Sequence, residues 1–176
     1  MTAPWPSQAD VLRYASPYGD PRGRTVGVGS AAWESANLVY VKAPFKMTYA
    51  GQAVTKGMRV HRYCAASLGR VMANLMDAAG GDQATLDLWG VSIYSGAHNF
   101  RLMRGLNSLS MHSFGCAIDF DQSRNSLGDA TPRFAQFPAV LAAFADEKWR
   151  WGGDWNGNGL TSDERRPDGM HWQATA

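Results

Sequence analysis

The stretch Ser110–Asp121 reads S-M-H-S-F-G-C-A-I-D-F-D, and the interpretation of the whole chain starts from it. Its residues alternate with the period of two that is typical of a β-strand. The two faces of this strand are Cys116, Ile118 and Phe120 on one side and Ala117, Asp119 and Asp121 on the other. His112 precedes Asp119 by seven residues, and Gly115 between them allows the chain to turn. We therefore expect an imidazole and a carboxylate that converge on one metal ion.

A third ligand must come from another part of the chain, and the segment Asp168-Gly169-Met170-His171-Trp172 offers the best candidate. Zinc sites in hydrolases have three protein ligands and an open position for water. His112, Asp119 and His171 would supply two imidazoles and one carboxylate. Asp168 precedes His171 by three residues, so a turn of chain could place it beside the metal-bound water as the general base. The alternative is that these are scattered polar residues that share no site.

Composition indicates one globular domain, residues 1–176. The chain has 176 residues, of which 45% are hydrophobic. The net charge of +2 is too small to indicate a nucleic-acid-binding protein. The two cysteines, Cys64 and Cys116, exclude a disulfide scaffold but leave open either two buried thiols or one disulfide. No apolar run approaches the roughly 20 residues that a membrane-spanning helix needs.

Residues 1–36 are rich in proline and glycine, and we expect an irregular N-terminal arm with one or two helical turns at Gln8–Tyr14. The N-terminus lacks the positive and apolar regions of a secretory signal. If the substrate is extracellular, another protein must deliver this one.

The rest of the chain predicts an α+β fold, in which a small antiparallel sheet carries the site and two helices flank it on one side. The predicted helices are residues 65–79 and 135–146, and the predicted strands are residues 37–41, 45–49, 58–60, 86–94, 110–121 and 148–151. His61 has no partner at ligand spacing, so we expect a structural role for it.

Two motifs resemble those of a known family. The run Ser110–Asp119 resembles the S-x-H-x-x-G-x-A-x-D signature of the M15 metallopeptidases, which include D-alanyl-D-alanine carboxypeptidases and VanX-like dipeptidases. Asp168–Trp172 resembles the second motif of this family, and the resemblance extends from about Ser95 to Trp172. It implies a hedgehog-like peptidase fold, zinc bound by His112, Asp119 and His171, and Asp168 as the catalytic acid or base.

The same resemblance implies an arginine upstream of the first motif that holds the substrate carbonyl or the developing oxyanion. Arg101 matches this position better than Arg104, which we assign to substrate binding; a solvated loop charge is the alternative for either. Trp155 and Trp172 would flank the site and contact substrate or support the ligands. Asp121 would be either a partner of a ligand histidine or a charge at the strand end.

The sequence Gly152-Gly153-Asp154-Trp155 is similar to a motif of the L-alanyl-D-glutamate peptidase branch, which includes phage endolysins. This implies an endopeptidase that cleaves the L-alanyl-D-glutamate bond of peptidoglycan stem peptides. We also expect the protein to be a monomer. It would lie in the cytoplasm of an infected host before release to the cell wall, or on a virion. The alternatives are a D,D-carboxypeptidase or dipeptidase of the same family, and an inert cell-wall-binding module.

A second, weaker metal site is conceivable in the loop that follows this motif. Side-chain oxygens stand at positions 1, 3 and 5 of a calcium-type loop, with glycine at position 6. The candidate ligands are Asp154, Asn156, Asn158, Asp163 and Glu164. Position 12, where such loops need a bidentate acid, is Arg165, so Asp163 or Glu164 would have to substitute. The alternative is a turn rich in asparagine and glycine.

Overall fold

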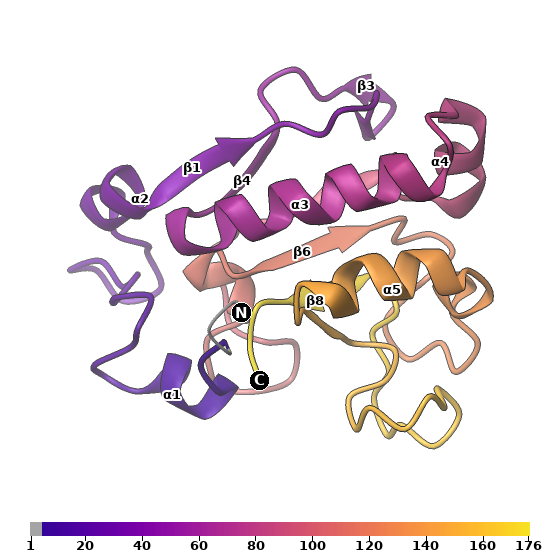
Figure 1. Cartoon of the computed structure of the whole chain (residues 1–176). Helices are drawn as coiled ribbons and strands as arrows, with labels where there is room; N and C mark the ends of the chain where they lie inside the picture. The colour runs from indigo at the N-terminus through magenta and orange to yellow at the C-terminus, as the bar shows by residue number, and fades with distance from the viewer. Residues whose placement is uncertain (1–4) are drawn as a thin grey trace.

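A four-stranded antiparallel sheet lies at the centre of the structure, with the strand order β5–β6–β8–β7. Its strands are β5 (Tyr94–Gly96), β6 (Ala117–Phe120), β7 (Arg150–Trp151) and β8 (His171–Gln173). The computed structural model describes residues 5–176 (Figure 1). Strand β8 lies between β6 and β7, so a segment from near the C-terminus occupies the middle of the sheet.

The pairing of β6 with β8 fixes which side chains meet. Asp119 lies opposite His171, Ile118 opposite Trp172, and Ala117 opposite Gln173. Because successive side chains of a strand point to opposite faces, Asp119, His171 and Gln173 share one face of the sheet. Ile118 and Trp172 point to the other face, where both are buried.

Two helices pack side by side against the apolar face, α3 (Arg62–Ala78) and α5 (Pro138–Asp146) (Figure 1). Trp172 stacks on Phe144 of α5 with 4.0 Å between the ring centroids. Burial of such large apolar side chains supplies the main driving force for folding. The predicted α+β architecture is therefore confirmed.

A partly buried polar link joins α3 to the residue that follows α5. The Glu147 carboxylate accepts hydrogen bonds from the Ser67 hydroxyl at 2.8 Å and from Arg70 Nε at 2.6 Å. The Ser67 hydroxyl also accepts a bond from the Trp149 indole at 2.9 Å. The hydrogen bonds from Arg70 lower the pKa of Glu147. This link fixes the C-terminal end of α5 against α3.

Two small hairpin-like sheets complete the domain. Strand β1 (Leu38–Val41) pairs with β4 (Met58–His61), and β2 (Thr48–Tyr49) pairs with β3 (Gln52–Ala53). The His61 side chain accepts a hydrogen bond from the Tyr63 amide and so caps α3, which is the structural role that we expected. Cys64 and Cys116 are both buried free thiols, which excludes a disulfide between them.

The N-terminal arm is more regular than its composition suggests. It contains α1 (Gln8–Leu12), at the position expected for helical turns, and most of α2 (Ala31–Asn37). Ser7 and Ser30 cap these helices, each accepting a hydrogen bond from an amide of the first turn. Part of the signal-peptide prediction falls on residues 1–4, outside the described residues. Among residues 5–176, no helix has the length and apolar character needed to cross a membrane.

The predicted strand at residues 86–94 is wrong over most of its length. Residues Gln83–Trp89 form helix α4 instead, and the strand β5 starts only at Tyr94. The Asp82 carboxylate accepts hydrogen bonds from the amides of the first turn, and Gly90, with φ +91°, ends the helix in the left-handed conformation. Both are ordinary helix-end signals, and they override the alternating apolar pattern between them.

The predicted strand at Ser110–Asp121 is shorter than expected. Ser110 caps a 3₁₀ helix, η1 (Met111–Phe114), and the strand begins only at Ala117. Gly115 makes the turn between them with φ +66°, as the sequence suggested. Likewise, the predicted helix at residues 135–146 is divided into the 3₁₀ helix η2 (Arg133–Gln136) and α5, because Pro138 starts a new helix.

Gly115 provides a test of the turn that leads into β6. A Cβ at this position would lie 2.6 Å from Leu38 Cδ2 and 2.8 Å from the His61 amide nitrogen. Gly51 has φ +78° and open space around it, so it serves as a matched control. We expect Gly51→Ala to lower the free energy of unfolding by about 1 kcal/mol, from the left-handed backbone alone. Gly115→Ala should cost about 1–3 kcal/mol more. Equal losses in urea unfolding would contradict this assignment.

Candidate active site

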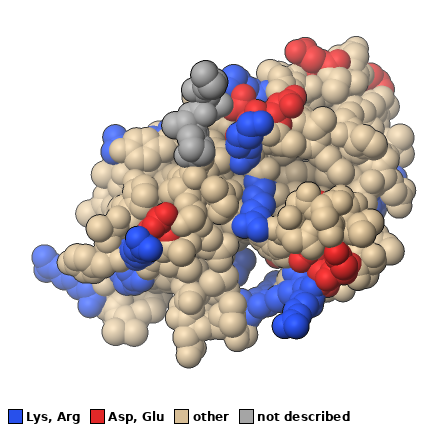
Figure 2. Space-filling model, turned by 60° about the horizontal axis from the view of Figure 1, so that its bottom comes forward, with Lys and Arg blue, Asp and Glu red and all other residues tan. Residues whose placement is uncertain are grey.

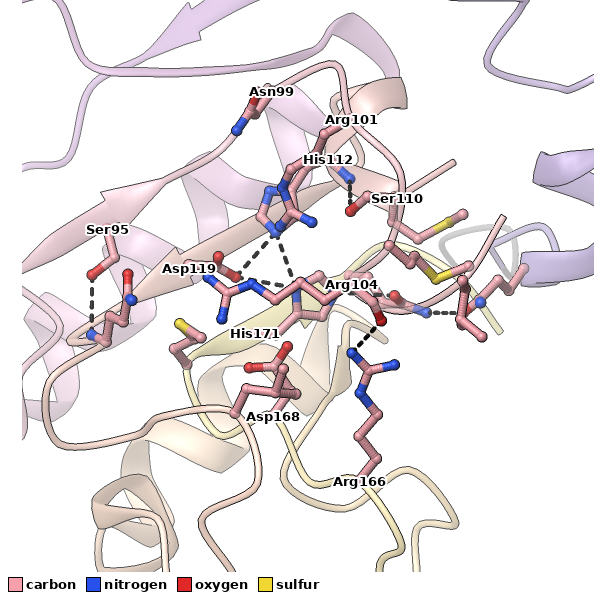
Figure 3. A pocket seen from close by; sticks show the side chains of 18 of the residues that line it. Ser95, Asn99, Arg101, Arg104, Ser110, His112, Asp119, Arg166, Asp168 and His171 are labelled. Carbon is pink, nitrogen blue, oxygen red and sulfur yellow. Dashed lines mark hydrogen bonds and ion pairs between the residues drawn. The ribbon is translucent and has the colours of Figure 1, made fainter. Parts of the chain in front are cut away.

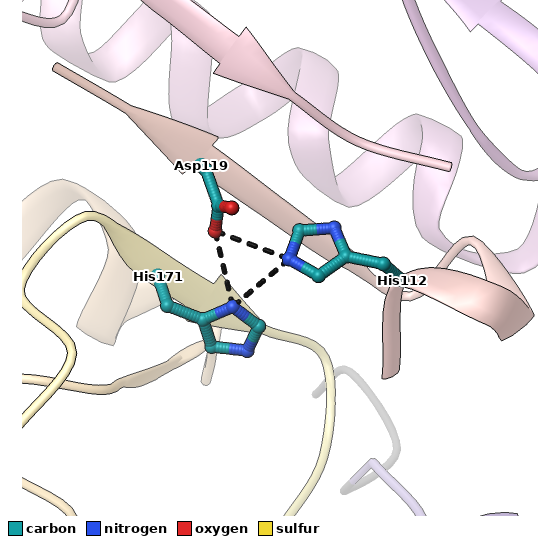
Figure 4. Close-up of side chains that lie close together, drawn as sticks. All are labelled: His112, Asp119 and His171. Carbon is teal, nitrogen blue, oxygen red and sulfur yellow. Dashed lines mark hydrogen bonds and ion pairs between the residues drawn. The ribbon is translucent and has the colours of Figure 1, made fainter. Parts of the chain in front are cut away.

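Three side chains converge on the polar face of the sheet: His112 from η1, Asp119 from β6 and His171 from β8 (Figure 4). His112 Nε2 lies 3.1 Å from His171 Nδ1 and 3.2 Å from Asp119 Oδ1. His171 Nδ1 lies 3.1 Å from the same carboxylate oxygen. Within residues 5–176, this is the only group of three or more His, Cys, Asp or Glu side chains arranged to hold a metal ion.

The spacing of these three atoms suits zinc. Zinc lies about 2.0–2.2 Å from nitrogen and carboxylate oxygen ligands, so tetrahedral neighbours are about 3.3–3.5 Å apart. The three atoms form a nearly equilateral triangle of about this size. Two imidazoles and a carboxylate are also a donor set that zinc accepts in hydrolases, with the fourth position open. The residues present therefore fit the ion that the sequence predicted.

Each histidine has a second contact that fixes its orientation. His112 Nδ1 lies 2.6 Å from the Ala97 carbonyl oxygen, and His171 Nε2 lies 3.1 Å from Gln173 Oε1. Both partners are oxygen acceptors, so each ring must carry its hydrogen on the nitrogen that faces away from the triangle. The remaining nitrogen of each ring then presents its lone pair to the centre.

Electrostatics hold the carboxylate in its charged form. Burial acts to raise the pKa of Asp119, but His112 and His171 outweigh it, so this pKa lies well below its usual range. Burial acts to lower the pKa of His171, but a hydrogen bond to the Asp119 carboxylate reverses this, and the pKa is raised. Without an ion, a proton on Nδ1 of His171 would donate to Asp119, and a bound metal would take the place of that proton.

Asp168 lies beside the triangle on the segment that leads into β8 (Figure 3). Burial raises its pKa, and the neighbouring Asp119 charge acts in the same direction. Its Oδ1 is buried and has no hydrogen-bond partner among the described residues. A buried carboxylate oxygen without a partner is unusual and is well placed to accept a proton from water or substrate.

The backbone around Asp168 explains the glycines of the Gly152-Gly153 pair. The Asp168 amide donates to the Gly152 carbonyl at 2.7 Å, and the Gly152 amide donates to the His171 carbonyl at 2.8 Å. A Cβ on Gly152 would lie 2.5 Å from the Asp168 carbonyl oxygen. Glycine is needed there because the two backbones approach so closely.

A cavity of about 400 Å³ opens over this group (Figure 3). Its wall includes three arginines, Arg101, Arg104 and Arg166, together with Trp155. The Arg104 side chain extends into the cavity in Figure 3, and its charge acts to lower the pKa of Asp168. The sequence did not single out Arg166, whose guanidinium donates to the Arg104 carbonyl at 2.6 Å. Figure 2 shows Lys and Arg side chains around a hollow in the molecular surface.

The structure decides between the alternatives left open for two residues near the site. Trp172 does not contact the cavity: its side chain is 1% exposed and packs between Phe144 and Trp151 on the opposite face of the sheet. Asp121 is not a partner of a ligand histidine, because it lies past the end of β6 and pairs with Arg124 at 2.6 Å. Of the two tryptophans expected to flank the site, Trp155 does so, with its ring 5.8 Å from that of His171.

In the predicted calcium loop, the candidate side chains already make hydrogen bonds within the loop. Asp154 accepts backbone hydrogen bonds from Gly157, Asn158 and Gly159, at 2.8–3.1 Å. The remaining candidate side chains bond within the same loop: Asn156, Asn158, Asp163 and Glu164. These contacts describe a turn rich in asparagine and glycine, and nothing in the structure supports calcium binding.

A comparison with known protein families matches the part of the chain that contains the site. The family model of D-alanyl-D-alanine carboxypeptidase, an M15 peptidase, matches residues 104–174. This match supports a peptidase of the M15 family. It spans all three members of the triangle as well as Asp168, and M15 peptidases are zinc enzymes. No curated protein and no solved structure matches the chain.

The metal centre predicts the outcome of zinc titration. We expect the wild-type protein to bind one zinc ion per chain. Asp119→Asn removes the only charge among the three ligands and should weaken binding by more than the roughly 10–100-fold typical of outer-shell changes. Asp154→Asn, in the proposed calcium loop, should leave zinc binding unchanged. Competition with a chelating dye would measure both, and less than one zinc per wild-type chain would refute the site.

Proposed function

We propose that this protein is a zinc peptidase that cleaves the stem peptides of peptidoglycan, with the bond between L-alanine and D-glutamate as its target. The observation that carries the proposal is the His112–Asp119–His171 triangle, with Asp168 and its unpartnered oxygen beside it. The match to an M15 family model supports a peptidase acting on peptidoglycan-type substrates. The resemblance of Gly152–Trp155 to the endopeptidase branch supports the choice of bond.

The chemistry divides between the ion and the chain. Zinc held by His112, Asp119 and His171 would polarise the scissile carbonyl and lower the pKa of the attacking water. Asp168 accepts the proton from that water at its free Oδ1 and donates it to the leaving amine. Burial raises the pKa of Asp168, which suits a group that must both accept and return a proton.

The charges around the cavity fit an anionic peptide. Arg101, Arg104 and Arg166 line it, whereas Asp119 is occupied by the two histidines. Stem peptides carry free carboxylates along their length, so such a cavity would attract and orient them. Arg101 would hold the carbonyl or stabilise the oxyanion, and Arg104 would bind substrate. We also propose that the protein acts as a monomer, as a phage-type lysin that reaches the wall from an infected cytoplasm or from a virion.

A second candidate function is D,D-carboxypeptidase or dipeptidase activity. The match to the family model of D-alanyl-D-alanine carboxypeptidase favours it. The same metal centre and base serve either reaction, because both hydrolyse a peptide bond. The difference lies only in how the cavity places the substrate.

Mass spectrometry of purified muropeptides after digestion distinguishes these reactions. Endopeptidase cleavage after L-alanine should release a peptide that begins with D-glutamate. Carboxypeptidase activity would remove only the terminal D-alanine, and dipeptidase activity would cleave free D-alanyl-D-alanine. If the zinc-loaded protein leaves both the muropeptides and free D-alanyl-D-alanine intact, the inert wall-binding module is the better account.

Asp168→Asn tests the proton transfer. We expect kcat to fall by about 10²–10⁴-fold, because the amide cannot accept the proton, while the fold and zinc content persist. Asp77→Asn, an exposed change on α3, is the control. In the wild type, activity should fall as the pH falls through the pKa of Asp168. Because this pKa is raised, the fall should occur at a higher pH than for an ordinary aspartate. Full activity of Asp168→Asn would exclude this residue as the base.

The two arginines can be separated by their kinetic signatures. If Arg101 stabilises the oxyanion, Arg101→Gln should lower kcat by about 10²–10³-fold with little change in KM. If Arg104 binds substrate, Arg104→Gln should mainly raise KM. Steady-state kinetics on a defined muropeptide would measure both. The reverse pattern would transfer the oxyanion role to Arg104, whose charge already acts on Asp168.

A further inference from the structure

Gln173 lies on the site face of β8, two residues after His171, and its side chain is buried. Its carbonyl oxygen Oε1 lies 3.1 Å from His171 Nε2. Its amide nitrogen donates to Gln8 Oε1 at 3.0 Å and to Thr175 Oγ1 at 2.5 Å. Every polar atom of this side chain therefore has a partner, two of them from the same C-terminal segment and one from the N-terminal arm.

These contacts are directional. A carboxamide presents an acceptor on one side and donors on the other, and the opposite orientation would place its NH₂ group against His171. Gln8 Oε1 and Thr175 Oγ1 both accept from the nitrogen side of the Gln173 amide in the structure. In this orientation the oxygen faces the imidazole, which places the His171 hydrogen on Nε2. The lone pair of Nδ1 is left for the metal.

Packing and backbone hydrogen bonds fix the N-terminal arm beside the Gln8–Gln173 contact. Val11 of α1 is fully buried, and the Tyr18 hydroxyl donates to the Ala174 carbonyl at 2.8 Å. The Ala176 amide donates to the Pro6 carbonyl at 2.9 Å. The arm thus bonds to the chain just beyond β8 on either side of Gln8, so the position of the Gln8 amide is determined by packing and not by its own side chain alone.

We propose that Gln173 is the positioning residue for the metal ligand His171, and that Gln8 of the N-terminal arm completes it. Through the hydrogen bonds between Gln8 and Gln173 and between Gln173 and His171, the N-terminal arm would help to orient a metal ligand, although no residue of the arm is itself a ligand. This inference rests on the proposed zinc site. It concerns how tightly the site binds the ion, a property that can be measured apart from catalysis.

The experiment compares zinc affinity across two matched pairs of variants, using competition with a chelating dye. Gln173→Leu removes the acceptor and should weaken zinc binding by about 10–100-fold. Gln173→Glu keeps an acceptor for His171 and should stay within a few-fold of the wild type. Gln8→Leu should weaken binding by a smaller factor, and Gln8→Glu, which keeps the acceptor, should restore it. Gln52→Leu, an exposed change in β3, is the control.

A second measurement shows directly which nitrogen of the His171 ring binds zinc. In zinc-loaded protein labelled with ¹⁵N-histidine, two-bond ¹H–¹⁵N correlations should show His171 bound through Nδ1 and His112 through Nε2. In Gln173→Leu, the His171 signals should shift towards a mixture of the two ring nitrogens. A side chain that only filled space would not change this pattern.

The outcomes separate this inference from the zinc site itself. Wild-type affinity in Gln173→Leu, or equal loss in Gln173→Leu and Gln173→Glu, would overturn the positioning role while leaving the zinc site intact. Failure of the wild-type protein to bind zinc would remove both. If Gln173→Leu does not fold, as judged by circular dichroism, the pair Gln8→Leu and Gln8→Glu decides. Equal affinity in that pair would count against the proposal.

Discussion

The register between β6 and β8 is the constraint on which the site depends. It places Asp119 directly opposite His171, and the same alternation puts Ile118 and Trp172 into the core behind them. A slip of one residue would bring Trp172 opposite Asp119 and turn the whole of β8 over. The stacking of Trp172 on Phe144 therefore does more than fill the core, because it opposes a one-residue slip that would remove a ligand. Packing on the apolar face of the sheet therefore determines which side chains meet on the face that carries the site.

Around this register, each ligand histidine contacts an oxygen atom on its outer side. His112 Nδ1 lies against the Ala97 carbonyl, and His171 Nε2 lies against Gln173 Oε1, which in turn contacts Gln8 from the other end of the chain. These contacts form only when the domain is folded, so an unfolded chain would bind zinc far more weakly than the native state. By mass action, zinc should then stabilise the native protein as well as activate it. Without the ion, a proton on the inward nitrogen of His171 would bridge to Asp119 and occupy the place of the metal.

Much of the site could be predicted from the sequence, because His112, Asp119, Asp168 and His171 stand in two compact motifs. The position of Trp172 was missed, because no strand was predicted at residues 171–173, and only the strand β8 makes neighbouring side chains point to opposite faces. Helix α4 was missed because its apolar residues alternate as in a strand, although Asp82 and Gly90 carried the signals for its ends. Gln8 could not have been found: 165 residues separate it from Gln173, and only the fold brings them together.

The close pairing of Gly152 with Asp168 and His171 has a consequence for how such proteins could diverge. Two backbone hydrogen bonds close the base of the segment 153–167, so its length and content can change without moving the ligands beyond it. The segment supplies Trp155 and Arg166 to the wall of the cavity. Insertions or deletions there would reshape what the cavity accepts while sparing the catalytic centre. Gly152 thus separates the site residues, whose positions the chemistry requires, from the segment 153–167, whose sequence can vary and change which substrates fit.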